Sequence, residues 1–126
     1  GYTARGTLEV AVMVPPTIFP FDFGEESVDT GTMATINCAV TKGDTPISIS
    51  WLFNGEPVQS GYDSVMVTKS GKRISMLAIE SVRPEHSGIF TCIARNRAGE
   101  MQHSSELKVI GIEISNLYVY LPFPQP

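Results

Sequence analysis

The chain has 126 residues, which suits one domain and is too short for two ordinary ones. Hydrophobic residues make up 42% and charged residues 17% of it, as in a folded domain, and the formal net charge of −4 argues against nucleic acid or an anionic membrane as a partner. No apolar stretch is long enough to cross a bilayer, and no signal peptide is visible. We therefore expect any leader or membrane anchor of the parent protein to lie outside this sequence.

Short strands separated by turn residues are predicted along the chain. The alternating residues 7–14 predict a strand that Pro15 and Pro16 end, because proline lacks the donor that a sheet interior needs. Asn54-Gly55 predicts a tight turn. The strands expected in the first half cover residues 17–19, 24–28, 32–40, 47–53 and 56–59, with a turn at 42–46.

The second half follows the same plan. Its expected strands cover residues 64–68, 73–79, 90–95 and 100–109, with a corner at 81–88 and a hairpin at 96–99. One helical turn is expected at 84–87, and no longer helix. We therefore divide the chain into an N-terminal strand or linker (1–14), one all-β domain (15–110) and a C-terminal extension without an assigned role (111–126).

The spacing of two cysteines and one tryptophan predicts the fold. Cys38 lies on the strand expected at 32–40, Trp51 on the next strand, and Cys92 on the strand at 90–95. An aromatic residue, Phe90, stands two positions before Cys92. This is the spacing of an immunoglobulin-like β-sandwich with Greek-key connections, in which an indole packs against the cysteines of the two sheets. Leu77 and Ile79 are predicted to join Trp51 and Phe90 in the core.

The state of Cys38 and Cys92 is left open by the sequence. A disulfide implies an oxidising compartment and stabilises the fold by roughly 4 kcal/mol on the chain-entropy account. Two buried free thiols, as in intracellular muscle domains of this fold, are the alternative.

Two longer runs of residues resemble one family within this fold. The stretch 14–24 contains Pro-Phe-Asp-Phe-Gly after a Pro-Pro junction, and the stretch 38–51 contains Lys-Gly-Asp-Thr-Pro-Ile. Together with the intermediate-set (I-set) pattern, they resemble the immunoglobulin domains of the Dscam family. The likeness covers about residues 10–110. It is greatest to the variable seventh domain of arthropod Dscam and to the N-terminal variable domain of the shortened chelicerate Dscams.

The sequence departs from that family pattern at the corner before Cys92. Phe90 stands where a tyrosine is usual, which removes a hydroxyl hydrogen bond but keeps the buried ring. His86 stands where an aspartate is usual. We therefore expect the common Arg–Asp pair of this corner to be missing or replaced, with Arg73 left without its partner.

The sequence does not favour catalysis or metal binding. His86 lies in a corner and His103 on a strand, while both cysteines belong to the core, so no zinc ligand set is formed. His86 and Ser87 are adjacent, which is not the geometry of a nucleophile and its base. We expect no enzyme activity and no cofactor.

One sheet face is the candidate functional site. If Leu77 and Ile79 point inward, alternation places Met76 and its neighbours outward, where methionine suits an adaptable contact surface. A one-residue shift at a bulge is the alternative, and it would turn these methionines inward. The candidate face consists of Met33, Thr35, Asn37, Ser64, Met66, Thr68, Ile74, Met76 and Ala78, with Lys69 and Arg73 at its polar rim.

The resemblance implies that this face of the A-B-E-D sheet binds a second copy of itself. The domain would then serve homophilic, isoform-specific recognition in the extracellular part of a cell-surface receptor, next to neighbouring immunoglobulin domains. An antiparallel contact of this kind is isologous, so that one surface serves both partners. Recognition of a foreign ligand in invertebrate immunity and an intracellular structural role are the alternatives.

Overall fold

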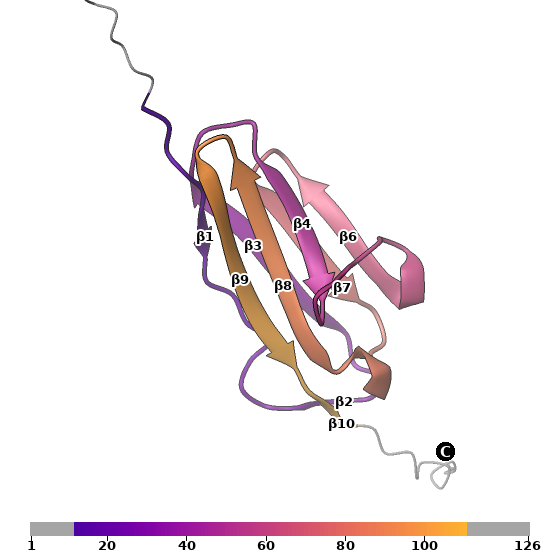
Figure 1. Cartoon of the computed structure of the whole chain (residues 1–126). Helices are drawn as coiled ribbons and strands as arrows, with labels where there is room; N and C mark the ends of the chain where they lie inside the picture. The colour runs from indigo at the N-terminus through magenta and orange to yellow at the C-terminus, as the bar shows by residue number, and fades with distance from the viewer. Residues whose placement is uncertain (1–11, 111–126) are drawn as a thin grey trace, which may run out of the picture.

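The computed structural model describes residues 12–110, which form two packed β-sheets (Figure 1). The first sheet has the strand order β1-β3-β7-β6 and the second has the order β5-β4-β8-β9. Figure 1 shows β4, β8 and β9 in front of β3 and β7. The first sheet consists of β1 (Thr17–Phe19), β3 (Ala34–Lys42), β7 (Ile74–Ile79) and β6 (Val65–Ser70). The second consists of β5 (Glu56–Pro57), β4 (Ser48–Phe53), β8 (Gly88–Asn96) and β9 (Gly99–Leu107).

These orders are those of an immunoglobulin sandwich, with β1, β3, β7 and β6 in the places of strands A, B, E and D. The predicted fold class is therefore confirmed. A short parallel pair, β2 (Val28–Asp29) with β10 (Val109–Ile110), closes one end. Two 3₁₀ turns, η2 (Tyr62–Ser64) and η3 (Pro84–His86), are the only helical segments between residues 12 and 110.

Alternation along the strands builds the core. On β3 the side chains of Ala34, Ile36, Cys38 and Val40 are buried, while those of Thr35 and Asn37 between them are exposed. Strand β7 shows the same period, with Leu77 and Ile79 fully buried. The predicted strand phase is thus confirmed, and the alternative of inward-pointing methionines on β6 and β7 is wrong.

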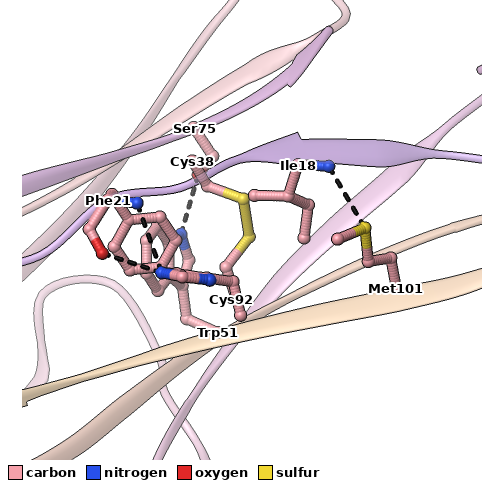
Figure 2. The surroundings of a disulfide bond; sticks show 8 residues. Ile18, Phe21, Cys38, Trp51, Ser75, Cys92 and Met101 are labelled. Atoms are coloured by element: carbon pink, nitrogen blue, oxygen red, sulfur yellow. Dashed lines mark hydrogen bonds between the residues drawn. A yellow bond between two sulfur atoms is a disulfide. The ribbon is translucent and has the colours of Figure 1, made fainter. Parts of the chain in front are cut away.

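The centre of the core is the predicted one (Figure 2). A disulfide joins Cys38 on β3 to Cys92 on β8, with the Cα atoms 6.3 Å apart, so it links the two sheets. The indole of Trp51 is buried, and its Nε1–H donates a hydrogen bond to the Oγ of Ser75 on β7 at 2.9 Å. The ring of Phe21 packs against Trp51 at a centroid distance of 5.7 Å. The open question of free thiols is therefore answered in favour of the disulfide.

Phe90 is the second aromatic anchor of the core. Its ring is 1% exposed and lies 4.6 Å from the ring of Phe53 and 5.5 Å from that of Phe23, measured between centroids. All three rings come from different parts of the chain, so their packing ties the segment after β1 to the second sheet. The predicted core role of Phe90 is confirmed.

Two predicted edge segments differ from the structure. Residues 12–14 form no strand, because Val14 exchanges hydrogen bonds with Asp44 of the loop after β3; the rest of the predicted strand 7–14 lies outside the described residues, as does the extension 111–126. The segment expected at 24–28 is limited to β2, since the preceding backbone bonds to side chains instead. The N–H of Phe23 donates to Ser105 Oγ at 3.0 Å, and the peptide backbone of Phe21 bonds to His103 Nε2.

The free edge of β6 is covered by a side chain. Ser60 Oγ accepts a hydrogen bond from the N–H of Val67 at 2.8 Å and lies 3.3 Å from the carbonyl oxygen of the same residue. The N–H of Gly61 donates to the carbonyl of Val65 at 2.7 Å. The loop before β6 therefore occupies backbone groups of that strand that β7 does not reach.

A candidate protein-binding face on the first sheet

The outer face of the first sheet is a regular grid of side chains, because the register of β3, β7 and β6 is continuous. One row contains Thr35, Ala78 and Met66, and the next contains Asn37, Met76 and Thr68. A third row continues onto β1 and consists of Phe19, Ala39, Ile74 and Ser70. Residues that are far apart in the sequence thus form one surface.

The structure places the candidate residues of β3, β6 and β7 on this surface together, with Met33 directly before β3, whereas Ser64 belongs to turn η2 and not to the predicted strand 64–68. Met33, Met66, Ile74 and Met76 are 58%, 52%, 39% and 36% exposed, and Thr35, Asn37, Ser64 and Thr68 are exposed as well. Ala78 is half-buried, since it lies in the middle of the sheet between longer side chains.

Phe19 was missed from the sequence. It is 64% exposed, more than any of the methionines, and it is the neighbour of Ala39 on the same outer face. The signal was present, because Ile18 next to it is buried and alternation then places Phe19 outward. A strand of three residues, following two prolines, is too short for that alternation to be assigned from the sequence alone.

Charges lie at the two ends of this face. In the part of the chain that is described, the outward positions of the three rows carry no charged side chain. Glu80 follows β7 at one end, and Lys72 precedes β7 at the other. Lys42 and Lys69 lie near the same end as Lys72, but they share the strand phase of inward Val40 and Ser75 and so do not belong to the outer face. The outer face is therefore uncharged in the middle, with Glu80 at one end and Lys72 at the other.

Arg73, expected at the rim of this face, points elsewhere. Its guanidinium donates to the carbonyl oxygens of Val40 at 3.4 Å and Gly43 at 2.8 Å, so it holds the loop after β3. These carbonyls take the place of an acidic partner for Arg73.

The Arg–Asp pair of the corner is replaced rather than missing. Arg83 contacts Asp63 at 2.6 Å and Glu85 at 3.0 Å. The hydrogen bond with Glu85, followed by the charges of both carboxylates, raises the pKa of Arg83 above its ordinary value. The pKa of Glu85 is lowered, first by a backbone hydrogen bond and then by Arg83. Buried His86 accepts a hydrogen bond from the Arg83 N–H at Nδ1, so its Nε2–H donates to the carbonyl of Asp63 at 2.9 Å.

Other kinds of site are not formed by the described residues. Between residues 12 and 110, no three histidine, cysteine or carboxylate side chains lie close enough together to hold a metal ion. No helix of that region is long and apolar enough to span a membrane. A hollow of about 280 Å³ lies away from the outer face, between β5 and β6, and Phe53, Val58 and Tyr62 line it.

Comparisons with known proteins agree with this geometry. A family model for the immunoglobulin domain matches residues 15–96. The cell adhesion molecule Dscam1 of Drosophila melanogaster is 46% identical over 109 residues, which are 86% of this chain and 5% of that protein. The solved Ig7 domain of Dscam1, isoform 5, is 44% identical with a TM-score of 0.75, over 76% of this chain and 97% of that one.

A structure from another protein has the same fold. An I-band fragment of titin is 27% identical with a TM-score of 0.70, over 79% of this chain and 34% of that one. The chain thus spans only a small part of the curated adhesion protein, whereas it covers nearly the whole of the solved Ig7 domain. The chain belongs to the immunoglobulin-domain family, and within that family it is a domain of the Dscam type.

Proposed function

We propose that this domain mediates homophilic, isoform-specific adhesion as part of the extracellular region of a Dscam-like receptor. Two copies dock through the outer faces of their first sheets. The likeness to Dscam1, whose name describes it as a cell adhesion molecule, supports the class of function. The disulfide supports an oxidising, extracellular location.

The observation that carries the proposal is the exposed apolar surface. Phe19, Met33, Met66, Ile74 and Met76 are all at least 36% exposed and share one sheet face. Burial of such apolar side chains in a contact stabilises the complex by about 25 cal/mol for each Å² of apolar surface removed from water. A face that gathers five of them without a covering element is suited to a protein partner.

The charges at the ends of the face favour an antiparallel arrangement. A two-fold axis through the middle of the face places Glu80 of one copy near Lys72 of the other, and the same contact recurs on the opposite side. A parallel arrangement brings like charges together instead. The uncharged middle of the face adds no repulsion in the parallel or the antiparallel arrangement. The charges at the two ends of the face therefore decide the orientation.

Polar residues within the face supply the specificity. Thr35, Asn37 and Thr68 lie in the same rows as Ala78 and Met76, so their hydrogen-bonding groups are buried when two copies dock. A buried donor or acceptor without a partner costs about 1–3 kcal/mol. A variant face that fails to match these groups is therefore rejected by as few as one or two side chains.

The affinity of a single domain can remain weak. Neighbouring domains of a receptor hold several contacts together, and the linked contacts act at a high effective concentration. Millimolar to micromolar self-association of the isolated domain is on the order of what the proposal needs.

Met76→Glu tests the proposal. The substitution places two carboxylates close together at the centre of the antiparallel contact, where they are unpaired and lose water, so we expect self-association to weaken by about tenfold or more. Sedimentation equilibrium over a wide concentration range measures the dissociation constant. Ile89→Glu is the matched control, since Ile89 is 47% exposed on the other sheet and leaves the contact unchanged.

Two results contradict the proposal. A wild-type domain that remains monomeric at millimolar concentration has no homophilic face, and recognition of a foreign ligand then becomes the better assignment. Equal losses in Met76→Glu and Ile89→Glu place the contact elsewhere. The alternative of an intracellular structural role is disfavoured by the disulfide, because a reducing cytoplasm keeps thiols reduced.

A further inference from the structure

Three of the five methionines of the chain lie on the face proposed for self-docking. Met33, Met66 and Met76 are exposed there, and Met66 and Met76 occupy neighbouring rows of adjacent strands. Leucine would provide a similar apolar area without a reactive atom. We infer that this face is a redox-sensitive contact, in which oxidation of its methionines to sulfoxides switches self-docking off; the inference rests on the proposed homophilic function.

The reaction needs a two-electron oxidant such as hydrogen peroxide. The thioether sulfur attacks one oxygen of the peroxide, the O–O bond breaks, an S–O bond forms, and water leaves. The sulfur is oxidised by two electrons and the peroxide is reduced by two. The product carries a polar oxygen and a new chiral centre in place of a flexible apolar side chain.

The surroundings of these methionines make the change unfavourable for docking. Met66 lies opposite Ala78 of β7, and Met76 lies between Ala78 and Ile74 on the outer side of β7. In the docked pair, the polar groups of the neighbouring row, Asn37 and Thr68, are already needed for matching, so a sulfoxide oxygen on Met66 or Met76 adds an acceptor without a donor assigned to it. Burial of a strong acceptor without a donor is costly, whereas the same oxygen is hydrated on a free monomer.

Docking and oxidation compete for the same atoms. The three methionine side chains are exposed in the monomer and covered in the proposed pair, so docking protects them from the oxidant. The other two methionines are different: Met13 is half-buried before β1, and Met101 lies on β9 in the second sheet, where its sulfur accepts the N–H of Ile18 at 3.3 Å.

The test compares three proteins before and after hydrogen peroxide: the wild type, Met33→Leu/Met66→Leu/Met76→Leu, and Met101→Leu. We expect peroxide to raise the dissociation constant of the wild type and of Met101→Leu by about tenfold or more, and to leave the triple variant within about twofold, as measured by sedimentation equilibrium. Peptide mass spectrometry locates the added oxygens. Thermal unfolding of each sample shows whether the fold is intact.

A second readout is the rate of oxidation. At concentrations above the dissociation constant, we expect Met66 and Met76 to oxidise several-fold more slowly than in dilute protein, with Met101 unchanged. Untreated wild type that fails to associate overturns the proposed function itself. Untreated wild type that associates, and still does so after Met66 and Met76 are oxidised, overturns the redox inference alone. Equal losses in the triple variant also overturn it.

Discussion

Trp51 shows how a single polar contact is used in an apolar core. The indole is 3% exposed, and the hydroxyl of Ser75 is the acceptor for its N–H. Ser75 is itself 2% exposed on β7, between outward Ile74 and Met76. This hydrogen bond explains why a serine is buried on the inner side of the sheet, because the indole N–H and the hydroxyl satisfy each other without water.

Ser75→Ala is expected to lower the free energy of unfolding by about 1–3 kcal/mol, because it leaves the indole N–H of Trp51 buried without an acceptor. Urea unfolding followed by the fluorescence of the only tryptophan measures the change. Ser50→Ala is the control, since Ser50 is exposed on β4 and its loss should cost less than about 0.5 kcal/mol. Equal effects of the two substitutions would contradict this account of Trp51.

Single residues differ in how far their roles follow from the sequence. The core positions of the cysteines and Trp51 and the outward orientation of Met76 are confirmed, because these positions repeat a known spacing or a period of two. Ser75 and Phe19 were not assigned, since their roles depend on which side chain lies opposite in space. The contacts of His86 with the backbone of Arg83 and Asp63 likewise bring together two loops that no local pattern connects.

At the scale of elements, the hairpin of β8 and β9 carries a defined ion pair. Arg95 and Glu100 are opposite each other in the ladder, with Arg95 Nη2 2.6 Å from Glu100 Oε1. The hydrogen bond from Arg95, and then the one from Gln102, holds the pKa of Glu100 below its ordinary value. A carboxyl group with a lowered pKa stabilises the folded state above its unfolded pKa, and this stabilisation is lost as the pH falls through the lowered value.

Glu100→Gln is therefore expected to reduce the acid sensitivity of the domain. Between about pH 5 and pH 2, the free energy of unfolding should fall less in the variant than in the wild type. Near neutral pH, the dependence of the unfolding free energy on pH should be similar in the two proteins. Urea unfolding at a series of pH values measures this difference. Glu106→Gln on the same strand is the control, because Glu106 forms no ion pair with another side chain of residues 12–110. An unchanged acid slope in Glu100→Gln would show that the pair is screened by water.

The order of the strands was predicted well, and their ends were predicted less well. Period-two alternation in β3, β4, β7 and β8 is long enough to identify each strand and its buried side. The prediction of a strand over residues 24–28 was wrong at 24–27. The backbone that precedes these residues bonds at Phe21 and Phe23 to side chains of β9, about eighty positions away in the sequence. Distant side-chain acceptors of this kind leave no periodic signal in the segment they bind.

For the molecule as a whole, the bond between Cys38 and Cys92 decides how the two layers stay together. The cysteines are 54 positions apart and completely buried, so the bond restricts much of the unfolded chain. Cys38→Ala/Cys92→Ala is expected to lose roughly 4 kcal/mol of stability on the chain-entropy account. Thermal and urea unfolding measure the loss, and wild-type protein with a mild thiol reductant should remain unaffected while it is folded. A double variant as stable as the wild type would contradict this role.

The loop before β6 protects the edge of that strand from association with other copies at high protein concentration. A bare outermost strand invites the next molecule to extend the sheet sideways, and repetition of that step produces fibres. Here Ser60 and Gly61 already occupy backbone groups of Val65 and Val67. When many copies are crowded together, lateral polymerisation therefore does not start along this side of the sheet.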